Sequence, residues 1–223
     1  MLLSLAIAPA LILLFYIYIR DKYEKEPIRL LVVGVFFGLI ITVPIVLVGN
    51  ILTLFLPSHA GQNFEAFYTS FVIAAFVEEI FKYVVLFFLV WSNRNFNEKF
   101  DGLVYAVFVS LGFAAVENIL YVFSEDMGGM VTALTRAVFS VPGHGLFAVF
   151  MGYFLSKARF NHPGYLVLAF VVPWLIHGVF NFFLLWTNPL GIYAFALLLA
   201  LLWHYAFKIM RYYIQISPFK PII

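Results

Sequence analysis

The stretch FVIAAFVEEIFKYVVLFFLV, residues 71–90, decides the fold because it places three charged side chains inside an apolar run. A run of about 20 residues is long enough to cross the hydrocarbon core of a bilayer, roughly 30 Å thick. Glu78, Glu79 and Lys82 near its middle cost on the order of 8–10 kcal/mol on an insertion scale, and the apolar residues return roughly 5–9 kcal/mol. The run therefore needs partners elsewhere in the chain that keep these charges away from lipid.

The composition assigns the chain to the membrane-protein class. Its 223 residues are 65% hydrophobic and only 11% charged, whereas soluble domains average about 45–50% apolar and about 25% charged residues. Water-soluble and disordered proteins are excluded, because disorder requires low hydrophobicity and high charge. The chain contains no cysteine, which removes thiol nucleophiles, cysteine-bound zinc and disulfides. A net charge of +2 gives no reason to expect a nucleic-acid partner.

Seven apolar runs predict an all-α polytopic membrane protein, with one membrane-embedded domain over residues 1–223 and no soluble domain. The predicted spans are 2–19, 28–56, 67–91, 102–123, 131–155, 164–186 and 190–210. The second span is over-long and contains Pro44, which predicts a tilt or a kink. Gly34 and Gly38 form a GxxxG pattern in the same span, which favours close packing against another helix of the chain.

The distribution of basic residues predicts the orientation. Eleven of the thirteen Lys and Arg residues follow the first, third, fifth and seventh spans. Because cytoplasmic loops are enriched in Lys and Arg, the N-terminus is predicted outside and the C-terminus in the cytoplasm. The exceptions are Lys82 and Arg136, which lies near the outer end of the fifth span. We expect Arg136 to pair with Glu125 or Asp126, or to contact a substrate.

Polar side chains in the next three spans are expected at the same depth as Glu78 and Glu79. They are Glu117, Asn118 and Tyr121 in the fourth span, His144 in the fifth, and His177 and Asn181 in the sixth. Within the third span, Lys82 can pair with Glu78 four residues earlier or with Glu79 three residues earlier. One buried histidine is usually a packing residue, but two histidines and several glutamates at one depth indicate a functional site.

Such a set of groups suits the activation of water. A buried glutamate can take a proton from water and later give it to a leaving amine, and a neutral histidine can orient the water. An amide, histidine or tyrosine can stabilise an oxyanion. There is no HExxH motif for a zinc protease, and no aspartate lies inside a predicted span. A pair formed by Ser140 and His144 is disfavoured, because Pro142 and Gly143 loosen the helix between them.

The stretches that carry these groups resemble the PrsW family of intramembrane proteases, which cut membrane-anchored anti-sigma factors. The resemblance runs along most of the chain in ordered motifs. These are PALILLFYIYIRDKYEKEP at 9–27, EEIFK at 78–82, DGLVYAVFVSLGFAAVENILY at 101–121, His144, and HGVFN at 177–181. The resemblance implies a multi-pass protein of the cell membrane. Its substrate would be a single-pass membrane protein, an anti-sigma factor, cut on or near the outer side.

The PrsW family is in turn similar to the type II CAAX prenyl proteases, and this similarity implies roles for individual residues. Glu78 would be the general base that activates water, and His144 would bind or orient that water. His177 and Asn181 would stabilise the tetrahedral oxyanion.

The remaining acids have supporting or less defined roles by the same resemblance. Glu79 would pair with Lys82 and set the position of the first helix of the site. Glu117 has no clear counterpart in the CAAX enzymes, and Asn118 and Tyr121 beside it are expected to support the site.

No metal is expected to be required, and zinc is the alternative. His144, His177 and Glu78 could supply three zinc ligands with an open fourth position. Against zinc, Lys82 lies beside the glutamates, and adjacent glutamates diverge by about 100° on a helix. A metal-independent glutamate mechanism is therefore favoured.

Two other functions are weighed against proteolysis. Buried glutamates and histidines also build proton relays, as in a proton-coupled transporter. A transporter would show broken helices in matching positions of two halves, and polar groups concentrated in spans three to six argue against it. A catalytically idle relative, such as a membrane chaperone or an immunity-type protein, would be expected to have lost part of the polar set, all of which is present.

Overall fold

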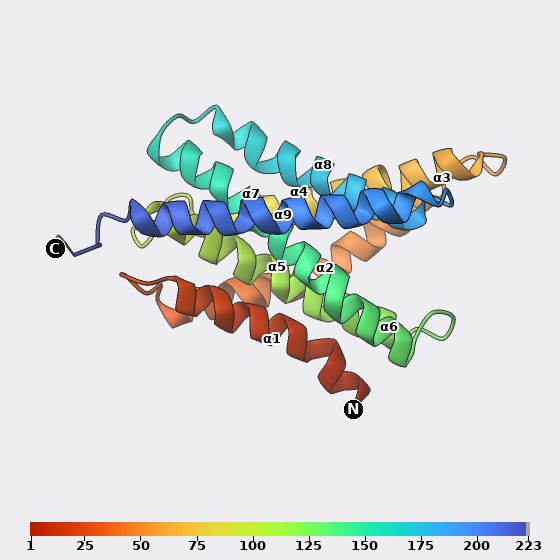
Figure 1. Ribbon diagram of the computed structural model, residues 1–223, viewed down its shortest axis with the longest axis horizontal. Coiled ribbons are helices and arrows are strands. Elements are labelled where there is room, and N and C mark those ends of the chain that lie inside the picture. Colours follow the sequence, from red (N-terminus) through yellow and green to blue (C-terminus); the bar gives the residue numbers. More distant parts are fainter. Residues whose placement is uncertain (222–223) are drawn as a thin grey trace.

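The computed structural model describes residues 1–221, which form a bundle of helices directed roughly along its long axis (Figure 1). The elements are α1 (Leu2–Arg20), α2 (Ile28–Thr53), α3 (Gln62–Tyr68), the π-helix η1 (Thr69–Phe76), α4 (Val77–Val90), α5 (Lys99–Val122), α6 (Met130–Thr135), the π-helix η2 (Arg136–Ser140), α7 (Val141–Phe160), α8 (Tyr165–Leu185) and α9 (Leu190–Gln215). The N-terminus and the C-terminus lie at opposite ends of the bundle.

Six helical segments among the described residues are long and apolar enough to cross a membrane. They correspond to six of the predicted spans, and the helices α6, η2 and α7 together make the fifth. The remaining predicted span, 67–91, lies in the helical run of α3, η1 and α4. Its three charged residues, Glu78, Glu79 and Lys82, make its composition more polar than that of the six apolar segments. The all-α polytopic membrane fold is confirmed, and the orientation of the termini stays a prediction.

Helix α5 lies at the centre of the bundle, where it packs against α1, α2, α4 and α7 (Figure 1). It begins with a capping box in which the side chains of Glu98 and Asp101 each accept the other residue's backbone N–H. These bonds satisfy N–H groups that the first turn of a helix leaves without partners. Most of the helix is buried, so α5 is the wall against which the other helices present their polar groups.

Glycines allow the neighbouring backbones to approach α5 closely. A Cβ atom on Gly38 of α2 would collide with the carbonyl oxygen of Val109, and one on Gly152 of α7 would collide with the carbonyl of Gly102. The prediction that the GxxxG pattern packs inside the chain is confirmed at Gly38. Pro44 lies inside α2, and the helix continues through it.

The outer surface of the bundle is apolar. Phe15, Phe36 and Phe88 are 66%, 57% and 81% exposed, and many other large apolar side chains are exposed with them. A surface of this kind is unusual in a soluble monomer and is the expected surface of a bundle that faces lipid. The loops after α1, α4 and α7 lie at the same end as the C-terminus (Figure 1), so the basic residues gather at that end.

Candidate active site

Lys82 of α4 lies at the centre of the candidate site. Its Nζ atom donates to Glu79 Oε1 at 2.9 Å and to Glu78 Oε2 at 3.1 Å, and it lies 3.2 Å from His144 Nδ1 on α7. The side chain is only 1% exposed, and the ring of Phe113 from α5 lies 4.3 Å from Nζ. Lys82 therefore pairs with both glutamates, where the spacing left the choice open, and it joins α4 to α7.

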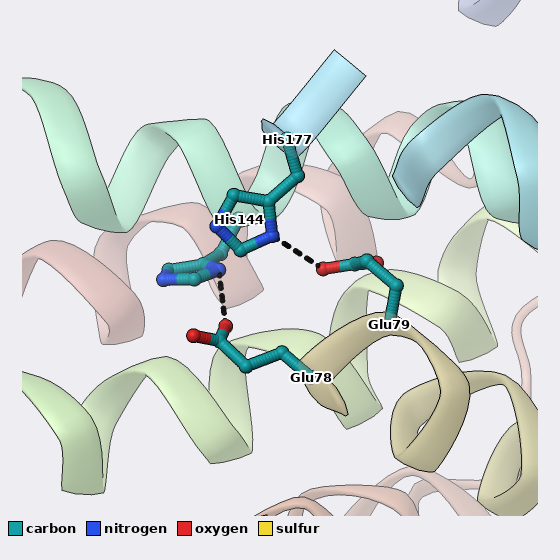
Figure 2. Close-up of side chains that lie close together, drawn as sticks. All are labelled: Glu78, Glu79, His144 and His177. Carbon is teal, nitrogen blue, oxygen red and sulfur yellow. Dashed lines mark hydrogen bonds and ion pairs between the residues drawn. The ribbon is translucent and has the colours of Figure 1, made fainter. Parts of the chain in front are cut away.

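Glu79 connects this lysine to His177 on α8. Nδ1 of His177 lies 3.0 Å from Oε1 of Glu79, and its Nε2 lies 3.1 Å from Nδ2 of Asn181. Because an ionised carboxylate only accepts, Nδ1 carries the proton, and Nε2 then accepts from the amide of Asn181. In Figure 2 the two histidines face the two glutamates, His144 toward Glu78 and His177 toward Glu79.

Glu117 of α5 connects His144 to Arg136. Its Oε2 atom lies 2.9 Å from Nε2 of His144 and 2.6 Å from Nη2 of Arg136. Arg136 also donates from Nε to Asn118 Oδ1 at 2.9 Å, and its guanidinium lies 4.0 Å from the centre of the Tyr121 ring. Because the Glu117 carboxylate can only accept, Nε2 of His144 carries the proton and donates a hydrogen bond to Glu117. Nδ1 of His144 is then unprotonated and accepts a hydrogen bond from Lys82.

The expected pairing of Arg136 with Glu125 or Asp126 is wrong. Both acids are exposed in the loop between α5 and α6, where water already solvates them. The carboxylate of Glu117 is mostly buried, so it needs a countercharge much more. The position of Arg136 away from the basic loops singles it out in the sequence. That position does not identify Glu117 as its partner.

Two π-helical segments precede the residues of the site. The π-helix η1 ends directly before α4, which carries Glu78, and η2 ends directly before α7, which carries His144. Pro142 has no N–H to donate to the carbonyl of Val138, so the regular α-helical pattern fails in the turn before it. The predicted loosening around His144 is therefore found one turn earlier. Wide turns of this kind often occur at functional sites.

Two cavities border the site. The α2-side cavity, about 380 Å³, lies between α2, η1 and α5, and the α8-side cavity, about 280 Å³, lies between η1, η2, α7 and α8. Glu78, Glu117 and Tyr121 line both cavities, while His144, His177 and other polar groups line the α8-side cavity. Glu79 and Asn118 lie behind this surface, 1% and 0% exposed.

The structure brings together every residue that the sequence singled out. These are Glu78, Glu79, Lys82, Glu117, Asn118, Tyr121, His144, His177 and Asn181. A chain of hydrogen bonds runs from Asn181 on α8 to Arg136 on η2, and Arg136 completes the set. The functional role of each residue stays a prediction.

The site has donors for a metal ion, but a lysine lies among them. One ligand atom each from Glu78, Glu79, His144 and His177 lie within 4.8 Å of one another, so divergence along the helix does not keep the glutamates apart. The Nζ atom of Lys82 lies 2.9–3.2 Å from three of these residues. An ammonium ion and a divalent cation 4 Å apart repel by about 8 kcal/mol at an effective dielectric constant of about 20. The side chains in this arrangement therefore do not fit a metal ion.

The fold and the site define a multi-pass membrane protein with a buried, hydrogen-bonded cluster of acids and histidines. The family described as PrsW family intramembrane metalloprotease matches residues 26–208. The chain belongs to this family.

Curated relatives agree with the assignment. The chain is 37% identical to Protease PrsW of Geobacillus kaustophilus over 91% of this chain and 88% of the relative. It is 41% identical to Protease PrsW of Oceanobacillus iheyensis and 37% identical to that of Bacillus subtilis, each over 82% of both chains. No solved structure matches the chain. Family membership identifies the chain as a membrane protease.

Proposed function

We propose that the chain is an intramembrane endopeptidase that cuts a single-pass membrane protein, an anti-sigma factor, with water activated by Glu78 and without a metal ion. One observation carries this proposal. The carboxylate of Glu78 lies on the wall of both cavities, while the groups that fix its position lie behind it. This is the arrangement that a general base needs, because its proton acceptor must reach a bound water.

The difference between the two adjacent glutamates supports Glu78 as the base. Oε1 of Glu79 is held by both Lys82 and His177, and Glu79 does not line either cavity. Glu78 uses Oε2 for its bond to Lys82, which leaves Oε1 for a water molecule in the cavity. Glu79 is then the residue that orients Lys82 and His177.

The proposed reaction conserves atoms and protons. Glu78 takes one proton from water as the water oxygen attacks the carbonyl carbon, and the resulting oxyanion accepts a hydrogen bond from Asn181. Asn181 has two N–H donors, of which one is bound to His177 and one remains. When the C–N bond breaks, Glu78 returns the proton to the leaving amine. The products are a carboxylic acid and an amine.

Lys82 supplies the positive charge that a metal would otherwise supply. Its ammonium group binds both glutamates and accepts no proton in the reaction. His144 is held between Lys82 and Glu117 with both ring nitrogens bonded, so it is a positioning residue in this scheme. The family description includes the word metalloprotease. For this chain we propose a reaction without a metal, because the ammonium group of Lys82 lies among the groups that would bind one.

The test uses purified protein in lipid vesicles with a single-pass anti-sigma factor as substrate. Glu78→Gln is expected to reduce cleavage about 10²- to 10⁴-fold, the usual contribution of a general base. Glu65→Gln is the matched control, because Glu65 is exposed on α3. This variant is expected to cut the substrate at the wild-type rate. A strong chelator is expected to leave the wild type active, and protein as purified is expected to contain no stoichiometric metal.

Two results would overturn the mechanism. If chelation stops the wild type and zinc restores it, the reaction requires a metal. If Glu78→Gln cuts as fast as the wild type, another group is the base. A wild type that binds the substrate and leaves it uncut would instead favour a catalytically idle relative. Melting of each variant in detergent distinguishes lost chemistry from lost folding.

A further inference from the structure

The two cavities meet at the residue proposed as the base. Both are lined by Glu78, Glu117 and Tyr121, together with Ala74 of η1 and Met127 of the loop between α5 and α6. The cavities extend from this shared wall in different directions, one along α2 and one along α8. A reacting peptide bond at Glu78 therefore has space on both of its sides.

The two cavities are comparable in size. The α2-side cavity measures about 380 Å³ and the α8-side cavity about 280 Å³. The two spaces suit the side chains of a stretched segment, in which successive residues point to opposite sides.

The cavities also differ in chemistry. The α2-side cavity has the apolar side chains of Ile45, Val46 and Ile73 in its wall, and the polar residues that it does not share with the α8-side cavity are all uncharged. A Cβ atom on Gly49 would lie 3.7 Å from Cγ2 of Ile73, an ordinary van der Waals contact, so a larger residue at this position would fill space in the cavity next to Ile73. The α8-side cavity contains Arg136, Ser140 and Asn181, which can bind the backbone groups that an unwound segment exposes inside a membrane.

Resting on the proposed function, we propose that one extended substrate segment occupies both cavities across Glu78, and that the α2-side cavity selects an apolar side chain next to the cut bond. Residues on one side of the bond lie in the α2-side cavity and residues on the other side lie in the α8-side cavity. Val46 and Gly49 then determine how large the selected side chain can be.

The first test fills the α2-side cavity and leaves the lipid-facing side of the same helix as its control. Val46 lines the cavity and is 43% exposed at its edge, whereas Val43, three residues earlier on α2, is 65% exposed and lines neither cavity. Each valine is replaced by tryptophan, Val46→Trp and Val43→Trp. Cleavage is measured on two substrates that carry Leu or Ala at the positions flanking the cut bond.

Val46→Trp is expected to reduce kcat/KM for the Leu substrate about 10- to 200-fold, the range for steric loss in an apolar pocket. The Ala substrate should be cut at close to the wild-type rate, and Val43→Trp should cut both substrates normally. Equal rates of Val46→Trp on the two substrates would overturn the proposal even if the wild type is active. A wild type that cuts neither substrate would contradict the proposed function itself.

A second test reports on position and does not depend on catalysis. A photo-reactive amino acid replaces Val46 or Leu184, which lines the α8-side cavity, in the Glu78→Gln variant. Cross-links from the two positions are expected on opposite sides of the cut bond in the substrate. Cross-links from both positions to the same side would overturn the extended path through both cavities.

Discussion

Arg136 illustrates how a residue can control a site that it does not enter. Its guanidinium binds Glu117 at 2.6 Å and Asn118 at 2.9 Å, and Glu117 in turn binds Nε2 of His144 at 2.9 Å. The arginine therefore acts on His144 through one carboxylate. Without this countercharge, Glu117 would be a buried acid with less reason to remain ionised.

Replacing Arg136 should misplace the catalytic groups. Arg136→Gln is expected to lower kcat about 10²-fold, the loss typical of a displacement of about 1 Å, with a small change in KM. The matched control is Arg159→Gln, because Arg159 lies near the end of α7 beside Trp91. Arg136→Lys should recover part of kcat, since one of the two hydrogen bonds can form. A kcat unchanged in Arg136→Gln would contradict the positioning role.

For single residues, the sequence predicts well which side chains reach the site and at what depth in the membrane. It does not predict which side chains bind one another. Glu78, His144 and His177 met as expected because successive spans alternate in direction and rise by the same 1.5 Å per residue. Which atom meets which depends on the rotation of each helix about its axis, and packing on all sides sets that rotation. For this reason the link from Glu117 to Arg136 could not be found from spacing.

Among the helices, the contact between α2 and α5 depends on one of two similar glycines. A Cβ atom on Gly38 would collide with the backbone of Val109, whereas one on Gly34 would make ordinary contacts of 3.5 Å and longer. The two positions share a helix and a face, so they form a natural pair for comparison.

Gly38→Ala is expected to destabilise the protein by about 1–3 kcal/mol, because the added methyl group must push two backbones apart. Gly34→Ala should be neutral or slightly stabilising, since alanine is the better helix former by about 1 kcal/mol. Thermal unfolding in detergent measures both variants against the wild type. Equal melting temperatures for the two would show that the contact at Gly38 adapts without cost.

The limits of span prediction are clearest in the run from α3 to α4. Hydropathy placed the other spans within a few residues, because a bilayer demands a long apolar helix. It gave no sign that residues 69–76 form a π-helix, because hydropathy carries no information on how this segment packs against α8. The hydropathy pattern likewise does not predict the two cavities beside this segment.

Considered as a whole, the molecule has buried acids at the end where its basic residues gather. Asp21 and Glu26, in the loop between α1 and α2, are 0% and 3% exposed. Burial raises the pKa of Asp21 to about 7. Burial and the nearby charge of Asp101 raise the pKa of Glu26 to about 10. Both carboxyl groups are therefore held in their protonated form at acidic pH.

Stability should fall as the pH rises. The folded protein binds more protons than the unfolded chain between the ordinary pKa of Asp21, 3.8, and its raised value of about 7, so deprotonation favours unfolding over this range. The melting temperature in detergent is expected to decline from pH 5 to pH 9. Asp21→Asn should remove one part of the decline between pH 5 and pH 7, and the part that Glu26 contributes should remain both in that range and above pH 7. A pH-independent melting temperature in the wild type would contradict the burial of these acids.

The bonds from Lys82 to Glu78 and Glu79 lie within about one turn of one helix, and this has a consequence for the synthesis of the protein. Synthesis starts at the N-terminus, so α4 is complete before His144 and His177 have been made. During that interval Lys82 can offset one of the two negative charges of Glu78 and Glu79, and the partners on later helices are needed for the rest. The later helices then arrive at acids that already have their first countercharge, and the order of synthesis becomes the order in which the network is assembled.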